Sequence, residues 1–323
     1  MTLPANALVT VFGGSGFIGR HLVRRLAKAG YRVRVAVRRP DLAGHLQPSG
    51  SVGQIAFMQA NLRDRQSVQR AVEGADAVVN CVGILFEQGR QTFGAVQSEG
   101  ARLVAQAAAA AGITRLVHVS AIGADLKSGA VYAETKAQGE HAVLAAVPTA
   151  IILRPSIVFG PEDNFFNQFA DLARKLPFLP LIGGGHTKFQ PVYVGDVADT
   201  IMASLEGKAQ AGEVYELGGP AIMTFRQVLE YILSVTGRSR LLLPLPFALA
   251  KLQARFMQLL PKPMLTVDQV TMLEQDNIVS AQAIAENSTL QGLGIDPTNV
   301  ESIVPGYLYR FRKAGQFEKN KGG

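Results

Sequence analysis

The 323 residues of the chain include a single cysteine, Cys81. Because one cysteine cannot form an internal disulfide, we expect a reducing compartment, most simply a bacterial cytoplasm. None of the apolar runs reaches the roughly 18 residues that a transmembrane helix needs, so we expect no membrane-spanning segment. The first strand-like run begins near the start of the sequence, and a signal or transit peptide is therefore not expected either.

The five histidines are scattered, and none stands at a metal-ligand spacing from a cysteine or carboxylate, so we expect no metal site. Lys and Arg number 32 against 25 Asp and Glu, which gives a net charge of +7. Such a surface suits a phosphate-bearing ligand, an anionic lipid or an acidic protein partner. The basic residues are dispersed without interleaved aromatic residues, so no nucleic-acid partner is expected.

Short β-rich runs alternate with helix-length segments in the first half of the chain. The predicted strands span 8–12, 31–37, 55–59, 77–82, 116–120 and 150–154, and the predicted helices span 19–29, 64–72, 101–111 and 132–147. This alternation is typical of an α/β fold with a Rossmann-like, doubly wound parallel sheet, here over residues 1–155. We expect a smaller C-terminal α/β lobe over 156–306, at the carboxyl ends of the sheet strands, and a basic tail over 307–323.

A glycine-rich turn stands between the first predicted strand and the first predicted helix. Its glycines, Gly13, Gly16 and Gly19, are spaced GxxGxxG. Gly13 allows a tight turn, Gly16 lets the backbone approach a pyrophosphate, and Gly19 lets the helix pack close to the strand. The first amides of the helix then face the phosphate. The predicted phosphate-binding residues are Gly13, Ser15, Gly16, Phe17, Ile18, Gly19 and Arg20.

The end of the second predicted strand bears on the choice of nucleotide. An acidic residue there would bind a ribose 2′-hydroxyl of NAD, but the chain has Arg38 and Arg39, whose guanidinium groups suit a 2′-phosphate. We therefore predict NADPH rather than NADH; the alternative is that both arginines are surface residues at a strand end. The predicted neighbours of the adenine ring and of the nicotinamide ribose follow the third and fourth strands and are Asn61, Leu62, Cys81, Val82 and Gly83.

A serine, a tyrosine and a lysine form a candidate catalytic set. Tyr132 and Lys136 are four residues apart at the start of a predicted helix and therefore share a helix face. The ammonium of Lys136 would lower the pKa of the Tyr132 phenol and hold ribose hydroxyls. Ser120 ends the preceding predicted strand, where its hydroxyl would bind a substrate carbonyl. Pro155 and Ile157, after the sixth predicted strand, complete the predicted cofactor-binding residues.

In order and spacing, the glycine turn and Ser120, Tyr132 and Lys136 resemble the short-chain dehydrogenase/reductase superfamily, in its extended or atypical branch. The chain departs from that pattern at Gln97, where many relatives carry an asparagine. A narrower resemblance covers most of the chain. The segment 154–167, with 190–198 and 265–270, is similar to the NADPH-binding accessory subunits of respiratory complex I and their bacterial relatives.

That narrower resemblance implies a tightly held NADPH with no established turnover, in a subunit at the junction of the peripheral and membrane arms. It implies complex I subunits as partners. It also implies a peripheral location on the cytoplasmic face of a bacterial inner membrane, or on the matrix side in an organelle. Residues 246–260 have one basic and one apolar helical face, and we expect either an ordinary packed helix or a surface that meets a membrane or partner. Residues 307–313 combine aromatic and basic residues and suit a peripheral anchor or a partner-binding tail.

Two functions therefore compete. In the favoured one, the chain is an accessory subunit that holds NADPH as a structural ligand. In the alternative, it is a free NADPH-dependent reductase or epimerase of a carbonyl or sugar-like substrate, with Ser120, Tyr132 and Lys136 as catalytic residues.

Overall fold

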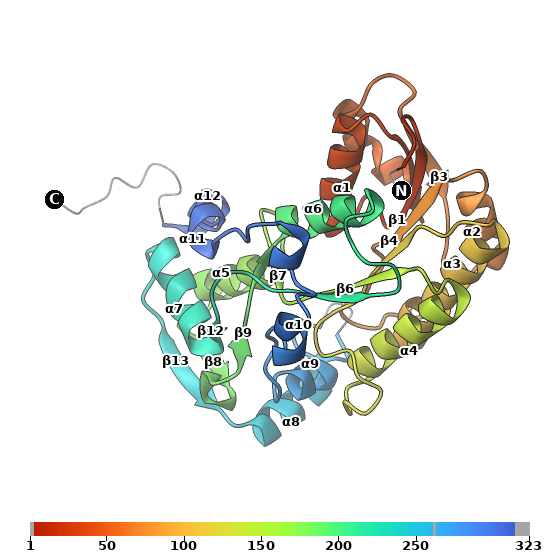
Figure 1. Cartoon of the computed structure of the whole chain (residues 1–323). Coiled ribbons are helices and arrows are strands. Elements are labelled where there is room, and N and C mark those ends of the chain that lie inside the picture. The colour runs from red at the N-terminus through yellow and green to blue at the C-terminus, as the bar shows by residue number, and fades with distance from the viewer. Residues whose placement is uncertain (1–2, 261–262, 314–323) are drawn as a thin grey trace. The chain divides into compact units, whose positions relative to one another are not determined.

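The computed structural model describes residues 3–260 and 263–313, which belong to two units (Figure 1). Unit 1 consists of Met1–Pro155, Val194–Leu217 and Val279–Asp296. Unit 2 consists of Ser156–Tyr193, Gly218–Ile278 and Pro297–Gly323. None of the helices in the described ranges has the length and apolar character needed to cross a bilayer.

Unit 1 is built on a parallel sheet, which in the described part of the chain has seven strands. Their spatial order is β11 (Val214–Leu217), β6 (Ile151–Pro155), β5 (Leu116–Val119), β4 (Ala77–Asn80), β1 (Leu8–Phe12), β2 (Arg32–Val37) and β3 (Ile55–Gln59). The order of strands along the chain reverses between β1 and β4, and ligands bind in such sheets outside the carboxyl ends of the strands at this point. The predicted Rossmann-like, doubly wound parallel sheet is confirmed.

Helices cover both faces of this sheet (Figure 1). On one face α1 (Phe17–Lys28) packs against α6 (Val194–Leu205). On the other, α2 (Arg65–Val72), α3 (Glu99–Ala110) and α4 (Val131–Ala146) pack in series. Every residue of β4 and of β5 is buried, as expected for parallel strands covered on both faces.

Two parts of unit 1 were not expected. The seventh strand, β11, pairs in parallel with β6, and the segment 279–296 belongs with the sheet rather than with the lobe expected over 156–306. These features depend on pairings between residues far apart in the sequence, which local patterns do not reveal.

Unit 2 contains short strands and helices around two apolar clusters. Its elements are β7 (Val158–Phe159), α5 (Phe165–Lys175), β8 (Phe178–Ile182), β9 (Lys188–Phe189), β10 (Val192–Tyr193), β12 (Met223–Thr224), α7 (Phe225–Thr236), β13 (Leu241–Leu245), α8 (Phe247–Met257), α9 (Val267–Met272), α11 (Val300–Ile303) and α12 (Pro305–Leu308). The strands pair two by two, as β7 with β10, β9 with β12 and β8 with β13. In unit 1, the segment 279–296 also contains the short helix α10 (Ala281–Ala285).

The expected tail from residue 307 differs from the structure. Tyr307, Leu308 and Phe311 are buried in one of the two apolar clusters of unit 2. The Tyr307 hydroxyl donates a hydrogen bond of 2.5 Å to the carboxylate of Asp163. These three side chains are therefore core residues rather than a free anchor, and residues 314–323 of the expected tail lie outside the described residues.

A charged network joins four parts of unit 1. Arg154 of β6 donates to both carboxylate oxygens of Glu140 on α4, with Nε–Oε1 at 2.9 Å and Nη2–Oε2 at 2.6 Å. Its Nη1 lies 3.8 Å from Oε1 of Glu216 on β11, and Oε2 of Glu216 accepts the Ser280 N–H at 2.7 Å. The Glu140 side chain is almost completely buried, so its charge depends on Arg154 for compensation.

We expect the substitution Glu140→Gln to lower the free energy of unfolding by about 3 kcal/mol, because Arg154 is left without its buried carboxylate partner. Urea unfolding followed by circular dichroism measures the loss. Glu206→Gln is the matched control, since Glu206 pairs with Lys208 at 3.4 Å on the surface of the same unit, and its loss should stay below about 0.5 kcal/mol. Equal losses in the two variants would contradict this account.

Candidate functional site

The turn between β1 and α1 leaves no room for side chains at its glycines. Gly13 has φ +74°, and its carbonyl accepts the Gly16 N–H at 2.9 Å. A Cβ placed on Gly19 would lie 2.3 Å from the Gly13 carbonyl oxygen and 2.6 Å from the Cα of Gly14. The first turn of α1 therefore packs directly on the loop. Its unpaired N–H groups carry the positive end of the helix dipole to the same place, as an anion site requires.

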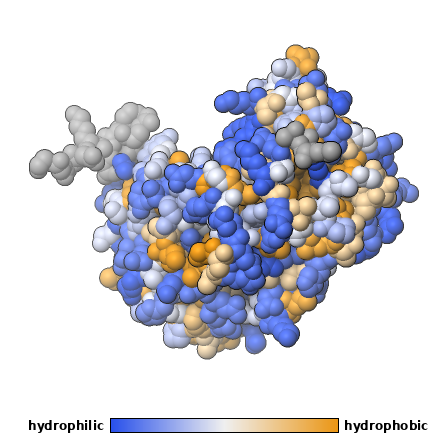
Figure 2. Space-filling model, in the orientation of Figure 1, coloured by the Kyte–Doolittle hydropathy of each residue, from blue (hydrophilic) through white to orange (hydrophobic). Residues whose placement is uncertain are grey.

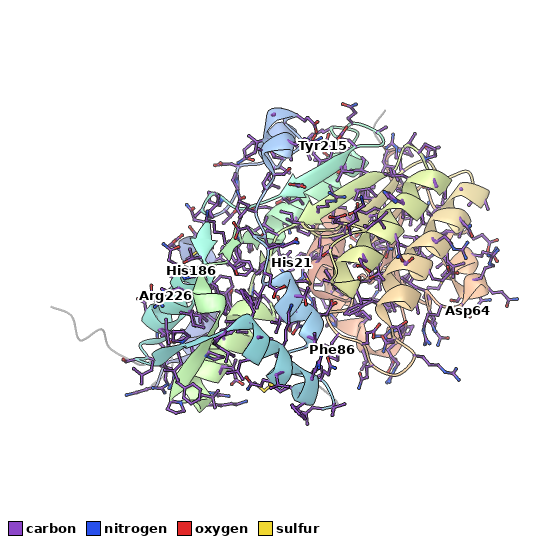
Figure 3. All side chains as sticks on the ribbon, turned by 90° about the horizontal axis from the view of Figure 1, so that it is seen from below. His21, Asp64, Phe86, His186, Tyr215 and Arg226 are labelled. Carbon is purple, nitrogen blue, oxygen red and sulfur yellow. The ribbon has the colours of Figure 1, made fainter. Side chains whose placement is uncertain are left out.

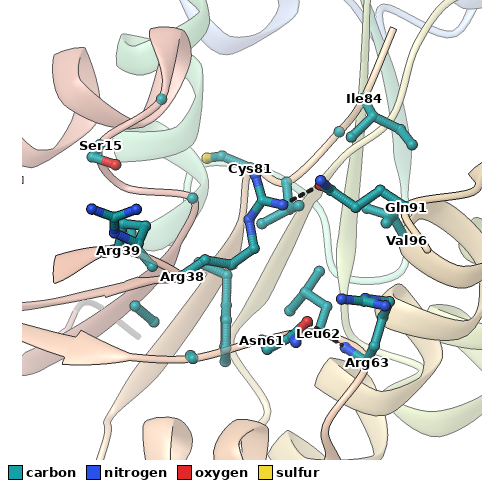
Figure 4. A pocket seen from close by; sticks show the side chains of 18 of the residues that line it. Ser15, Arg38, Arg39, Asn61, Leu62, Arg63, Cys81, Ile84, Gln91 and Val96 are labelled. Carbon is teal, nitrogen blue, oxygen red and sulfur yellow. Dashed lines mark hydrogen bonds between the residues drawn. The ribbon is translucent and has the colours of Figure 1, made fainter. Parts of the chain in front are cut away.

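A cavity of about 360 Å³ lies at the carboxyl ends of β1 to β4 (Figure 4). Its lining includes Gly13, Ser15, Gly16, Arg38, Arg39, Asn61, Leu62, Cys81, Val82 and Gly83, all expected from the sequence. The lining also includes residues that were not predicted: the strand-end residues Phe12, Ala36, Val37 and Ala60, together with Leu42, Arg63, Ile84, Gln91 and Val96. A rule that takes the last residue of each parallel strand would have found Phe12 and Val37, whereas Gln91 lies in a loop that no local pattern links to the cavity.

Other predicted cofactor residues lie outside this lining. Phe17, Ile18, Gly19 and Arg20 form the first turn of α1, and Arg20 donates back to the carbonyls of Ser15 and Gly16 at 3.2 and 3.3 Å. The Pro155 carbonyl accepts the Ile122 N–H at 3.0 Å at the end of β6. Ile157 belongs to unit 2, where it packs against the apolar cluster that contains Leu179 and Phe225.

Lys136 is buried next to the cavity. Its Nζ donates to the Val119 carbonyl at 3.1 Å, and a Cβ placed on the lining residue Gly83 would lie 3.5 Å from this Nζ. Burial lowers the pKa of Lys136 to about 8, while the negative charge of Glu140, one helical turn later, acts in the opposite direction. The ammonium is therefore still the main form at neutral pH. Burial also raises the pKa of the Cys81 thiol to about 12, which keeps this group a neutral thiol.

Ser120 and Tyr132 flank Lys136 without lining the cavity. The Ser120 backbone N–H donates to Leu153 at 2.7 Å, but its buried Oγ has no hydrogen-bond partner among the described residues. The Tyr132 ring packs edge-on against Phe93, with ring centroids 5.6 Å apart. A buried hydroxyl without a partner is costly, so the Ser120 Oγ is an atom that a ligand group would satisfy.

Gln97, which stands where many relatives carry an asparagine, connects the segment around Ile84 with helix α4. It lies in a single π-helical turn, Gly94–Ser98, immediately before α3. Its side-chain amide donates to the Ile84 carbonyl at 2.8 Å, and its Oε1 accepts the Thr135 hydroxyl of α4 at 3.2 Å. A Cβ on Gly139 would lie 2.4 Å from the Gln97 carbonyl oxygen, so glycine at that position is what allows α4 to approach the turn.

The histidines do not build a site. His118 is buried in β5, where its Nδ1 lies 3.2 Å from the side-chain nitrogen of Asn80. Burial lowers the pKa of His118 to about 3, so this ring is neutral. His186 lies in unit 2 beside Arg226, while Asp64, which caps α2, lies in unit 1 (Figure 3). Within residues 3–260 and 263–313, no group of His, Cys, Asp and Glu is arranged to hold a metal ion.

These residues fit a dinucleotide. The glycine turn and the start of α1 provide the anion site, the strand ends line a cavity, and an ammonium and a buried hydroxyl without a partner among the described residues lie beside it. This is the arrangement that binds a pyrophosphate and its two ribosides at the switch point of an α/β sheet.

Comparisons with known proteins agree with this geometry. Residues 9–218 match the family described as the NAD dependent epimerase/dehydratase family. The chain is 37% identical, over 96% of its length and 79% of the relative, to NADH dehydrogenase [ubiquinone] 1 alpha subcomplex subunit 9, mitochondrial, of Arabidopsis thaliana. It is 34% identical, over 63% of its length and 62% of the relative, to a ceramide reductase of Caulobacter vibrioides.

A solved structure with the same fold is a dTDP-glucose 4,6-dehydratase from Streptomyces venezuelae with NAD and TYD bound. It has a TM-score of 0.70 at 22% identity, and the match covers 94% of this chain and 96% of that one. The family match over more than half of the chain and the glycine turn at its expected place lead to one conclusion: the chain belongs to the NAD dependent epimerase/dehydratase family, whose members bind a nicotinamide dinucleotide.

Proposed function

We propose that this chain is a nucleotide-binding accessory subunit of membrane-bound respiratory complex I, which holds NADPH as a structural ligand without turnover. The observation that carries the proposal is the likeness, across nearly the whole chain, to a subunit of mitochondrial NADH dehydrogenase. In this proposal the partners are complex I subunits near the junction of the peripheral and membrane arms. The location is the cytoplasmic face of a bacterial inner membrane, or the matrix side in an organelle.

The residues around the cavity have separate parts in holding NADPH. Residues 13–20 bind the pyrophosphate, and the 2′-phosphate lies at the end of β2, where the chain has Arg38 and Arg39. Asn61 and Leu62 contact the adenine ring, while 81–83 contact the nicotinamide ribose. Lys136 holds the ribose hydroxyls. The proposed contacts at the nicotinamide end are Ser120, Tyr132 and Pro155.

Helix α8 supports docking on a large partner. Its buried positions are the small residues Ala250 and Ala254, whereas large apolar side chains of 246–260 are 51 to 80% exposed: Leu249, Leu252, Phe256, Leu259 and Leu260. On the face drawn in Figure 2, apolar residues lie in small groups between hydrophilic ones. The exposed apolar side chains of 246–260 are typical of an interaction site, and we propose that they meet the membrane surface or the membrane arm.

Purification of the tagged chain from native membranes in mild detergent tests the proposal. We expect complex I subunits to co-purify and NADPH to be identified as the bound nucleotide by mass spectrometry. The double variant Leu252→Gln and Phe256→Gln should reduce retention of the other subunits, because both side chains belong to the exposed face of α8.

The matched control is Leu126→Gln, which changes a similarly exposed leucine of unit 1 outside the cavity lining and should leave retention unchanged. A chain that stays in the soluble fraction with no complex I subunit bound would refute the proposal. Retention of the subunits by the α8 double variant would refute only the role of this helix.

The pKa of Lys136 predicts how NADPH affinity changes with pH. The ammonium that donates to ribose hydroxyls is present below about pH 8 and is lost as the pH rises through that value. We expect the affinity measured by nicotinamide fluorescence to fall several-fold, roughly fivefold, between pH 7 and pH 9.5. Lys136→Met should bind more weakly at pH 7 and lack this step. An identical pH profile in both proteins would show that Lys136 does not contact the nucleotide.

The alternative function is a free NADPH-dependent reductase or epimerase that acts on a carbonyl or sugar-like substrate. The observation favouring it is the complete set of Ser120, Tyr132 and Lys136, together with the likeness to a ceramide reductase. In this case Tyr132 would exchange the proton and Ser120 would orient the carbonyl.

Oxidation of bound NADPH by a panel of carbonyl substrates tests the alternative. If turnover is found, Tyr132→Phe should lower kcat by about a hundredfold or more, because the phenolic proton is lost, and should change NADPH affinity little. Unchanged turnover in Tyr132→Phe would exclude this residue as the acid or base.

A further inference from the structure

A short segment beside the cavity has a fixed shape. We refer to residues 87–93 as the strap. Gln88 and Gln91 exchange both backbone hydrogen bonds, each of 3.0 Å, around a two-residue turn in which Gly89 has φ +55°. The carboxylate of Glu87 accepts the Phe93 N–H at 2.7 Å and closes the base of the strap. The strap is therefore a closed tight turn rather than a loose loop.

Two cationic residues of the cavity lining bind this strap. Arg38, at the end of β2, donates from Nη1 to the side-chain oxygen of Gln91 (Figure 4). Arg63, after β3, donates from Nη1 to the Arg90 carbonyl at 3.3 Å. Arg38, Arg63 and Gln91 all line the cavity. The strap thus fixes the position of a guanidinium group at the adenosine end of the predicted nucleotide site.

The neighbouring arginine has a different partner. Arg39 donates from Nε and Nη2 to the carboxylate of Asp41, at 3.0 and 2.7 Å. This carboxylate offsets part of the charge of Arg39 and occupies one edge of its guanidinium, in a pair whose two side chains are exposed. Gln91 is neutral, so Arg38 keeps its full charge and most of its five N–H donors for an anion.

We propose that Gln91 is a positioning residue that sets the nucleotide preference: its side-chain oxygen holds the Arg38 guanidinium over the cavity, so that Arg38 rather than Arg39 binds the 2′-phosphate. The inference rests on the proposed binding of NADPH. It assigns Gln91 no contact with the nucleotide itself. The residue acts only through Arg38, and its effect must therefore disappear when Arg38 is removed.

A double-mutant cycle on the full chain tests this dependence. The probes are 2′,5′-ADP and 5′-AMP, which differ only in the 2′-phosphate, and their Kd values are measured by calorimetry. We expect the wild type to bind 2′,5′-ADP at least about tenfold more tightly than 5′-AMP, because a charge-assisted hydrogen bond is worth about that much. Gln91→Ala should reduce this ratio about threefold or more, with the Kd of 5′-AMP unchanged.

The remaining variants separate positioning from simple structure. Arg38→Ala should remove the preference, and Arg38→Ala with Gln91→Ala should give the same ratio as Arg38→Ala alone. Gln91→Glu should reduce the ratio further than Gln91→Ala, because a carboxylate neutralises Arg38 and repels the phosphate. Gln88→Ala, on the same strap but outside the cavity lining, and Arg39→Ala should both leave the ratio unchanged.

The outcomes that overturn the inference are specific. Equal weakening of both probes by Gln91→Ala would make the residue a general part of the cavity wall. Additive effects in the double variant would show that Gln91 acts independently of Arg38. If the wild type binds both probes equally, the proposed NADPH preference fails, and the role of Gln91 fails with it. Discrimination in the wild type that survives Gln91→Ala refutes the inference alone.

Discussion

The ion pair between Arg154 and Glu140 is the interaction on which the part of unit 1 beside the cavity depends. The Arg154 guanidinium binds Glu140 of α4 with two hydrogen bonds and lies near Glu216 of β11, and Glu216 in turn holds the segment 279–296 through Ser280. Lys136 stands one helical turn before Glu140, so the contact that fixes α4 against the sheet also fixes the lysine beside Gly83. Burying an ammonium is expensive, and the Glu140 carboxylate, itself held by Arg154, offsets part of that cost. The Arg154–Glu140 pair therefore contributes both to the stability of this part of the fold and to keeping a charged lysine beside the cavity.

The charge of the partner also explains why the adjacent residues Arg38 and Arg39 differ in what they can offer a ligand. Arg39 pairs with Asp41, two residues later in the chain, so this contact is local in the sequence. Arg38 makes its contact across the cavity, with a residue 53 positions away. A guanidinium paired with a carboxylate has little left to offer an anion, while one held by an amide oxygen retains its charge. Which of two neighbouring cations serves the ligand is decided by the partner of each, and the sequence around Arg38 and Arg39 does not contain that information.

Local patterns were enough to predict what local forces determine. The runs 8–12 and 55–59 have the expected bounds, since strand periodicity acts within a few residues. The glycine turn is equally local, and its residues Gly13, Ser15 and Gly16 line the cavity. β11 was missed because its assignment depends on pairing with β6, about 60 residues earlier, and Gln91 because only the closed strap brings it to β2. For residues 246–260 the sequence left open whether the helix is an ordinary packed one or presents a surface to a membrane or partner; in α8 the buried residues are Ala250 and Ala254, small side chains that allow close packing on α9.

A complete set of serine, tyrosine and lysine is weaker support for turnover than its chemistry suggests. Two of its members would also serve a ligand that is only held: in the proposed NADPH site the Lys136 ammonium would donate to ribose hydroxyls, and a polar group of the nucleotide would satisfy the buried Ser120 Oγ, which has no hydrogen-bond partner among the described residues. Selection for tight binding alone would keep both. The apolar side chains exposed on α8 have no such double explanation, because a free enzyme gains nothing from a surface that favours aggregation, whereas a subunit covers it in its assembly. The exposed apolar face of α8 therefore adds a second argument for the accessory subunit to the likeness across nearly the whole chain, whereas the catalytic-type residues of unit 1 suit either function.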